Sequence, residues 1–268
     1  MQIGNKQFDV KNETYIMGIL NVTPDSFSDG GKFNTLDAAL FHAEEMIRDG
    51  AAIVDVGGES TRPGYQKISD EEEIERVCPV IEGIRSRLDT VISIDTYKSA
   101  VAKAALASGA DIVNDVWGFK ADPEIANVTA KAGAACILMH NKAEAVYNNF
   151  MEDMKQELRE SIAIAKAAGV QDDRIIVDPG VGFGKSYENN LEAIAQVQQL
   201  KELGYPVLLA TSRKSVIGLT LDLPSDQRVE GTLVTSVYGV QKGCAFVRVH
   251  DIKENARAIA MTKALMRF

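Results

Sequence analysis

The sequence lacks the features that define several classes of protein. Its three cysteines, Cys78, Cys136 and Cys244, are far apart and match no paired metal or redox spacing. An odd number of distant cysteines argues against a disulfide framework, so we expect apolar thiols in a reducing compartment. No apolar run approaches the length of a membrane span, and residues 1–15 lack the basic-then-apolar layout of a signal peptide. We therefore expect a cytoplasmic protein with no membrane partner.

Basic residues are also outnumbered by acidic ones. Lys and Arg total 29 against 38 Asp and Glu, which gives a formal net charge of −9. This balance works against non-specific binding to nucleic acid, so we expect no nucleic-acid partner. An anionic ligand would have to meet a local cluster of positive groups.

Domain boundaries are absent as well. No linker rich in proline, glycine or serine interrupts the 268 residues, so we expect residues 1–268 to form a single domain. Eight short, continuous apolar runs are present instead, each typical of a strand that is covered on both faces in a parallel sheet. They are residues 15–20, 52–56, 91–94, 111–113, 135–139, 175–177, 207–209 and 245–249.

Helical patterns separate these runs. Eight strand-helix units in about 250 residues are the signature of a (β/α)8 barrel, the TIM barrel of the α/β class. An open, doubly wound sheet is the alternative. Residues 1–12 lie outside the eightfold count, and Gly4-Asn5 predicts a small hairpin there that covers the bottom of the barrel.

Active sites of such barrels lie at the carboxyl ends of the strands, and nearly every predicted strand here ends in polar residues. These residues are Asn21, Asp55, Asp95, Asn114-Asp115, His140, Asp178, Ser212-Arg213-Lys214, Arg248 and His250. Any one of them alone could be a helix cap. Together they divide by charge: an acidic and neutral arc of Asp95, Asn114 and Asp178 suits a ligand rich in N–H donors. A basic arc of Lys214, Arg248 and His250 suits phosphate.

Seven motifs then carry a specific resemblance. They are "MGILNVTPDSFSDGG" (17–31), "VDVGGESTRPG" (54–64), "IDT" (94–96), "VND" (113–115), "DPGVGFGK" (178–185), "SRKS" (212–215) and "RVHD" (248–251). In this order they resemble the bacterial dihydropteroate synthases. The resemblance implies a TIM-barrel transferase of folate biosynthesis, usually a homodimer and the target of sulfonamide drugs. Such an enzyme joins 4-aminobenzoate to a dihydropterin methyl diphosphate and expels diphosphate.

The resemblance also implies a role for each matching residue. Asp178 would accept two parallel N–H bonds from the pterin, and Lys214 would donate to the pterin carbonyl and ring nitrogen. The resemblance implies further pterin diphosphate contacts for Thr61, Asp95, Asn114, Met139, Phe183, Arg248 and His250. Core packing is an equally good interpretation of Met139.

Three further predictions concern the second substrate, the metal and the chemistry. The aminobenzoate pocket would be formed by Phe27, Thr61, Arg62, Pro63, Lys214 and Ser215. The resemblance also implies a Mg2+ ion, held mainly by diphosphate and water, that would take the amide oxygen of Asn21 as its protein ligand. The catalytic set would be Asp95, Lys214, Arg248 and His250. Because an aromatic amine is a poor nucleophile, we expect diphosphate to leave first, giving a cation that the pterin delocalises.

Three alternatives stay open at this point. Lys214 could be a Schiff-base lysine of an aldolase, although it directly follows Arg213. A pterin-binding methyltransferase that serves a corrinoid would share the acidic arc but would not need Arg248 and His250. A non-catalytic pterin-binding homologue is disfavoured by the complete set of residues.

Overall fold

Eight parallel strands form the centre of the computed structural model, which describes residues 1–23, 32–59 and 67–268. They are β3 (Tyr15–Asn21), β4 (Ala51–Gly57), β5 (Val91–Asp95), β6 (Ile112–Asp115), β7 (Ala135–Met139), β8 (Ile175–Asp178), β9 (Leu208–Leu209) and β10 (Phe246–Val249). Their order in the sheet is β8-β7-β6-β5-β4-β3-β10-β9, and a parallel bridge between Val177 and Val207 joins the two edges. Because β3 pairs with β10 and the other strands follow one another in sequence, the barrel is confirmed over the doubly wound sheet.

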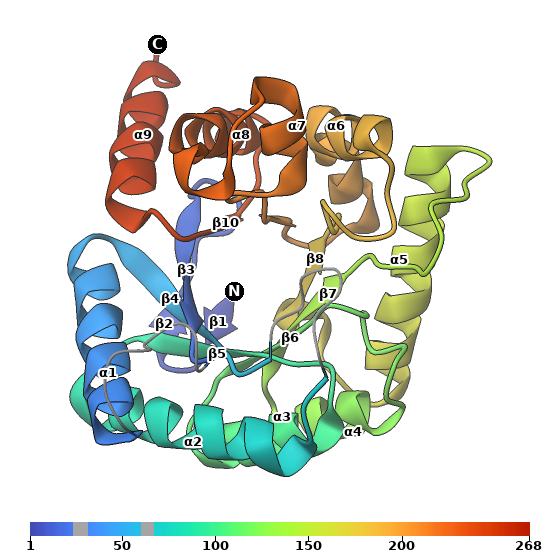
Figure 1. Cartoon of the computed structure of the whole chain (residues 1–268). Helices are drawn as coiled ribbons and strands as arrows, with labels where there is room; N and C mark the ends of the chain where they lie inside the picture. The colour runs from blue at the N-terminus through green and yellow to red at the C-terminus, as the bar shows by residue number, and fades with distance from the viewer. Residues whose placement is uncertain (24–31, 60–66) are drawn as a thin grey trace.

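The helices surround these strands (Figure 1). They are α1 (Lys32–Arg48), α2 (Asp70–Arg87), α3 (Ser99–Ala107), α4 (Glu124–Ala132), α5 (Phe150–Ala167), α6 (Tyr187–Ala195), α7 (Ser215–Leu221), α8 (Val229–Gln241) and α9 (Ile252–Leu265). Three short 3-10 helices lie in the connections between elements: η2 (Asp172–Arg174) before β8, η3 (Val197–Leu203) before β9, and η4 (Ser225–Gln227) between α7 and α8. Within the described ranges, every helix is too short or too polar to cross a lipid bilayer.

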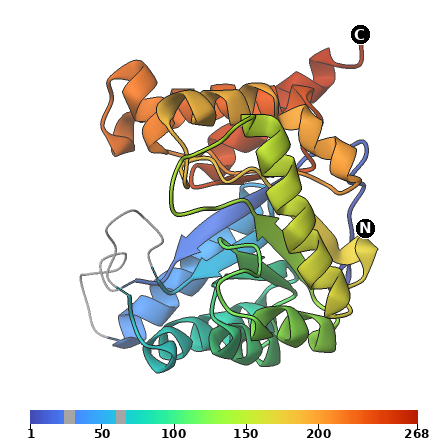
Figure 2. The ribbon, with the colours of Figure 1, turned by 90° about the vertical axis from the view of Figure 1, so that its right-hand side faces the viewer.

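The predicted hairpin is confirmed at the N-terminus. Strands β1 (Gln2–Ile3) and β2 (Lys6–Gln7) pair antiparallel. Ile3 and Phe8 are buried among residues at the start of the barrel strands, including Met17 and Phe246. The hairpin therefore covers the end of the barrel where the strands begin, and Figure 2 shows the N-terminus on that side.

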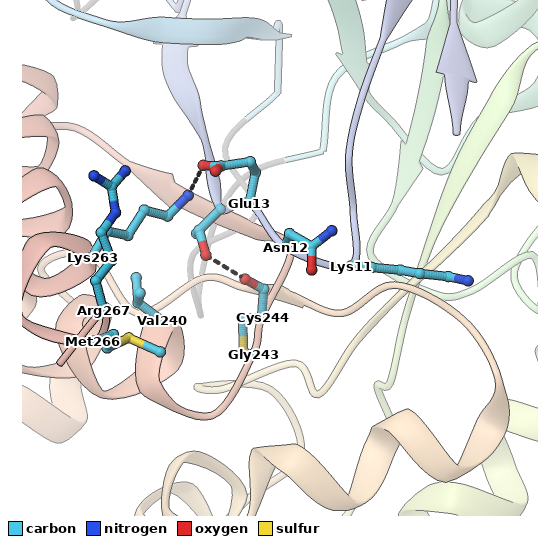
Figure 3. Close-up of a pocket in the computed structure, with 10 residues that line it drawn as sticks. Lys11, Asn12, Glu13, Val240, Gly243, Cys244, Lys263, Met266 and Arg267 are labelled. Carbon is cyan, nitrogen blue, oxygen red and sulfur yellow. Dashed lines mark hydrogen bonds and ion pairs between the residues drawn. The ribbon is translucent and has the colours of Figure 1, made fainter.

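A cavity of about 280 Å3 lies at the same end, between the segment before β3 and helix α9 (Figure 3). Lys263 forms an ion pair with Glu13 across it, and the Thr14 hydroxyl donates to the Cys244 carbonyl at 2.7 Å. Since Thr14 precedes β3 and Cys244 precedes β10, this cavity is remote from the carboxyl ends of the strands.

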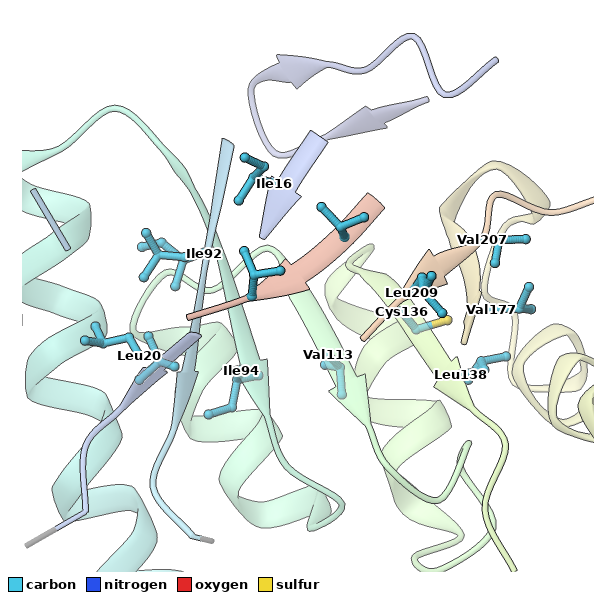
Figure 4. Close-up of a cluster of buried hydrophobic side chains, with 14 of the residues drawn as sticks. Ile16, Leu20, Ile92, Ile94, Val113, Cys136, Leu138, Val177, Val207 and Leu209 are labelled. Atoms are coloured by element: carbon cyan, nitrogen blue, oxygen red, sulfur yellow. The ribbon is translucent and has the colours of Figure 1, made fainter. Parts of the chain in front are cut away.

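Apolar side chains fill the layer between the barrel and its helices. Outward-facing strand residues such as Leu20, Ile94, Val113 and Leu138 form this layer (Figure 4). Inside the barrel, apolar residues at the start of strands such as β4, β5 and β6 give way to polar residues toward their ends, whereas β7 stays apolar to Met139. Successive strand residues point to opposite faces, so this inner series repeats every second residue. Apolar side chains therefore fill the end of the barrel where the strands begin. The opposite end, at the carboxyl ends of the strands, is more polar and is called the upper rim below.

Candidate active site

A row of four residues crosses the upper rim. The strand registers pair Asn21 with Gly57, Gly57 with Asp95, and Asp95 with Asn114. Gly57 has no side chain, and a Cβ placed there would lie 3.7 Å from Asn21 Oδ1 and 3.8 Å from Asp95 Oδ2. The glycine therefore leaves a gap between an amide oxygen and a carboxylate.

Arg248 crosses the barrel to reach two carboxylates. Its Nε donates to Asp55 Oδ2 and its NH2 group to Asp95 Oδ2, both at 2.6 Å, while Asn114 Nδ2 donates to Asp55 Oδ2 at 3.2 Å. The sequence assigned Arg248 to the basic arc and did not predict that it would also pair with Asp95 of the acidic arc. Its extended side chain spans the barrel interior, where two buried carboxylates need a counter-charge.

Two oxygens of this cluster have unused hydrogen-bonding capacity. Among the described residues, the buried Oδ1 atoms of Asp55 and Asp95 have no hydrogen-bond partner. Burial raises the pKa of Asp95, although the Arg248 guanidinium acts in the opposite direction. A buried polar atom without a partner costs free energy, which favours a ligand that brings a donor or a cation to this rim.

Asp178 is the corresponding carboxylate on the other side of the barrel. It is paired in register with Met139, and its Oδ1 accepts the Gly180 backbone N–H at 2.7 Å. Burial raises the pKa of Asp178, and the nearby Lys214 ammonium opposes that rise. One oxygen is thus held by the backbone, which fixes the plane of the carboxylate.

Lys214 enters the rim from a tight turn after β9. Arg213 has a φ of 57°, a left-handed conformation that is uncommon for a residue with a side chain. The Arg213 guanidinium binds both oxygens of Asp251, at 3.1 and 2.5 Å, and Arg228 donates to the Arg213 carbonyl at 3.0 Å. These contacts hold the turn that aims Lys214 into the barrel.

The Lys214 amine contacts the loop after β8. Its Nζ donates to the Val181 carbonyl at 2.5 Å and lies 5.0 Å from the centre of the Phe183 ring. Burial lowers the pKa of Lys214 to about 8, against the raising effect of Asp178. A lysine with this pKa is mostly protonated at neutral pH and can donate to a ligand edge.

His250 lies next to the same turn. Its Nδ1 is 2.9 Å from the Ser212 hydroxyl, and its backbone N–H donates to that hydroxyl at 3.1 Å. Because the hydroxyl accepts the backbone N–H, it can donate its own proton to Nδ1, which orients the imidazole.

Other predicted site residues are less defined. Phe27, Thr61, Arg62 and Pro63 lie outside the described residues. Ser215 is exposed at the first position of α7. The described residues place Asp95, Asn114, Asp178, Lys214 and Arg248 at one end of the barrel, while the role of Thr61 and the expected aminobenzoate pocket stay predictions.

Two groups near the rim were not assigned a role from the sequence. Asp55, fully buried, is a partner of Arg248, although the sequence placed it only among the polar strand ends. Lys98 Nζ contacts Glu59 at 2.9 Å, Glu73 at 2.7 Å and the Ile68 carbonyl at 2.9 Å. No motif signals Lys98, because its role depends on which loops the fold brings together.

The rim offers few protein ligands for the expected Mg2+ ion. The described part of the chain has no group of three His, Cys, Asp or Glu residues that could hold a metal ion. The gap above Gly57 is bordered instead by Asn21 Oδ1 and the Asp95 carboxylate. Mg2+ often takes one or two protein oxygens and completes its shell with water and phosphate, so these donors suit a shared ion.

Comparisons with known proteins show which family this chain resembles. A family model described as pterin binding enzyme matches residues 17–250. A dihydropteroate synthase of Clostridium beijerinckii is 58% identical over 268 residues, which is 100% of each chain. A solved dihydropteroate synthase from Clostridium difficile, in the presence of pteroic acid, has a TM-score of 0.95 and 50% identity, covering 98% of this chain and 100% of that one.

A second solved structure comes from a more distant relative. The dihydropteroate synthase of Xanthomonas albilineans with 4-aminobenzoic acid has a TM-score of 0.92 and 39% identity, covering 96% of this chain and 94% of that one. The family match covers most of the chain and the Clostridium beijerinckii relative covers all of it. This chain therefore belongs to the dihydropteroate synthase family of pterin binding enzymes.

Proposed function

We propose that this chain joins (7,8-dihydropterin-6-yl)methyl diphosphate to 4-aminobenzoate, giving 7,8-dihydropteroate and diphosphate. The observation that carries the proposal is the meeting of Asp178, Lys214 and the Asp55–Arg248–Asp95 cluster on one barrel rim. The Clostridium difficile relative was solved with pteroic acid, which contains both a pterin and an aminobenzoate unit. The Xanthomonas albilineans relative was solved with 4-aminobenzoic acid.

The pterin would lie against Asp178 and Lys214. The Gly180 N–H uses one lone pair of Asp178 Oδ1, so Oδ2 and the second lone pair of Oδ1 would accept from the amino group and ring N–H of the pterin. Lys214 would turn from the Val181 carbonyl to the pterin carbonyl and ring nitrogen. Met139 and Phe183 would supply apolar surface to the ring, while Asn114 and Asp95 would contact its other polar atoms.

The diphosphate would lie at the Arg248 side of the rim. Arg248 and His250 would donate to its oxygens, and negative charge on the leaving group would replace part of the carboxylate charge that Arg248 now neutralises. Asn21 would hold a Mg2+ ion shared with the diphosphate, with Asp95 across the gap above Gly57. The bound ion would supply positive charge that lowers the barrier to diphosphate departure.

The chemistry needs no nucleophile from the protein. After the carbon-oxygen bond to diphosphate breaks, the positive charge on the methylene carbon is delocalised by the electron-rich pterin ring. Asp95, which is buried at the rim, would stabilise the cation electrostatically. The aminobenzoate nitrogen then forms the new carbon-nitrogen bond and loses a proton. Product analysis by mass spectrometry tests the proposal, since an enzyme of this kind must yield the condensed pterin-aminobenzoate product.

A pH profile tests the role of Lys214. Since its pKa is lowered to about 8, Lys214 carries its charge below that pH and loses it above. We expect kcat/KM for the pterin substrate to fall as the pH rises through about 8, because this parameter reports the free enzyme. In Lys214→Arg, which stays charged, the alkaline limb should disappear. A wild-type profile that stays flat from pH 7 to 9 would remove Lys214 from pterin recognition.

Chelation tests the metal proposal. Removing Mg2+ with EDTA should suppress turnover by about 10²-fold or more, because several kcal/mol of charge stabilisation are lost. Adding Mg2+ back should restore it, and Asn21→Leu should require a higher Mg2+ concentration for half-maximal rate. Full activity under chelation would exclude the Mg2+ ion and with it the role of Asn21.

We also propose a cytoplasmic homodimer that associates through its last helices. Exposed apolar side chains on α7, α8 and α9 support this interface: Leu219, Leu221, Val234, Met261 and Leu265. All three cysteines are free, which is compatible with a reducing compartment. Sedimentation analysis of the wild type and of Val234→Asp would test the interface.

A further inference from the structure

The segment from Asp178 to Lys185, hereafter the 178–185 loop, lies directly against the chain that follows β7. Gly180 has a φ of 65°, and a Cβ there would lie 1.9 Å from the His140 carbonyl oxygen. Gly184 has a φ of 53°, and a Cβ there would lie 2.3 Å from the Lys142 carbonyl oxygen. Only glycine permits both the left-handed backbone and this close approach, so the two segments are matched to each other.

Lys185 and His140 join these segments by their side chains. Lys185 Nζ lies 2.8 Å from His140 Nδ1 and donates to the Phe183 carbonyl at 3.0 Å. His140 Nε2 lies 2.8 Å from Glu157 Oε2 on α5. Burial, with Lys185 close by, lowers the pKa of His140 to about 2, so the imidazole is neutral. A neutral ring that donates from Nε2 to Glu157 presents Nδ1 as an acceptor to Lys185.

Other side chains hold the remaining backbone groups of the loop. The Tyr147 hydroxyl donates to the Gly184 carbonyl at 2.6 Å, and Asn190 Oδ1 accepts the Gly182 N–H at 2.6 Å. Lys214 holds the Val181 carbonyl from the side of the proposed pterin site. Lys185, at the end of the loop, therefore binds His140 and the Phe183 carbonyl, while Lys214 binds the Val181 carbonyl on the side of the proposed pterin site.

We propose that Lys185 and His140 are a positioning pair that sets the shape of the 178–185 loop, and thereby places Phe183 and Asp178 against the pterin. This inference rests on the proposed function. Both residues act through the loop, since Lys185 holds the carbonyl of Phe183, whose ring lies under the Lys214 amine. Glu157 and Tyr147 support the pair from α5 and from the segment before it.

The direction of the effect follows from this geometry. Without the Lys185 amine, the Phe183 carbonyl and His140 Nδ1 both lose a donor in a partly buried place. The loop would then relax away from residues 140–142. Asp178 begins this loop and is oriented through the Gly180 N–H, so its carboxylate would shift too. Displacements of about 1 Å in a binding site can change rates on the order of 10²-fold.

The test compares substrate binding by the full-length wild type and Lys185→Met. We expect the variant to raise the KM and the calorimetric Kd for the pterin substrate by roughly 10- to 100-fold. The KM for aminobenzoate should change little. Lys155→Met is the matched control, because Lys155 is also buried and paired, with Glu152 at 2.7 Å and Glu202 at 2.8 Å, away from the loop. It should lower the melting temperature but keep the wild-type pterin KM.

Two His140 variants separate positioning from simple stability. In His140→Asn the amide oxygen takes the place of Nδ1 and can still accept from Lys185, whereas His140→Gln reaches toward Glu157 and loses that acceptor. We expect the pterin KM of His140→Asn to stay closer to the wild-type value. An equal or better KM for His140→Gln, or an unchanged pterin KM in Lys185→Met, overturns the positioning role alone. A wild type that binds no pterin overturns the proposed function as well.

Discussion

Replacing Asp178 with asparagine is expected to weaken pterin binding by roughly 10²-fold or more, since a mismatched buried hydrogen bond costs about 1–3 kcal/mol for each group. The Gly180 N–H already uses Oδ1 of Asp178, so the single oxygen of an asparagine would stay with that backbone group. The amide NH2 would then face the pterin amino group and ring N–H. The N–H donors of the asparagine amide would then face the N–H donors of the pterin, whereas the wild-type carboxylate offers them acceptors.

Calorimetry with the pterin substrate measures this effect. Asp122→Asn is the matched control, because Asp122 also accepts backbone N–H groups, from Ser99 at 2.8 Å and Glu124 at 3.0 Å. It lies at the start of α4 and touches none of the proposed pterin contacts, so its pterin affinity should match the wild type. Undiminished affinity in Asp178→Asn would contradict the assignment of this carboxylate.

Replacing Arg248 with methionine is expected to damage both stability and turnover. The variant leaves Asp55 and Asp95 buried without their counter-charge, and breaking a buried ion pair in this way costs about 3–5 kcal/mol in the free energy of unfolding. Loss of the guanidinium beside the leaving group should lower kcat by about 10²- to 10³-fold.

The stability loss should depend on pH in a definite direction. Without Arg248 the folded-state pKa of Asp95 rises further above that of the unfolded chain, because burial disfavours its charge. Protonation at low pH removes the unpaired charge, so the destabilisation should be small near pH 4 and grow toward neutral pH. Urea unfolding at several pH values measures it.

Arg85→Met provides the control for Arg248→Met. Arg85 pairs with Asp111 at 2.5 Å and donates to the Gly109 carbonyl, before strand β6 and away from the rim. This variant should unfold more easily but keep the wild-type kcat. If Arg248→Met were as stable and as active as the wild type, Arg248 would be neither the counter-charge of the cluster nor a contact of the leaving group.

Much of the fold was predictable because parallel strands leave a strong local signal. A strand such as Ala135–Met139 is covered on both faces, so its residues are continuously apolar until His140, the polar residue that follows it. The hairpin was predictable because Gly4-Asn5 is a local turn signal. In the structure Gly4 adopts a φ of 54° at that turn. The order of the strands then follows from the rule that crossovers join neighbouring parallel strands.

The site was less predictable, because its contacts depend on the stagger of the barrel. Arg248 is level with Met17 in the register yet reaches Asp55 and Asp95 across the interior, which no spacing in the sequence indicates. The sequence therefore grouped Arg248 with His250 by charge but did not predict its contacts with the two carboxylates. The contact between His140 and Lys185 was not predictable either, because 45 positions separate the two residues in the sequence.

The most direct test of the account measures diphosphate and condensed product in the same reaction. The purified chain is given the pterin methyl diphosphate with Mg2+, with and without 4-aminobenzoate. The account predicts that, with aminobenzoate, diphosphate and 7,8-dihydropteroate form in equal amounts, and that both fall together in Arg248→Met. Release of diphosphate with no condensed product, or no release at all, would contradict it.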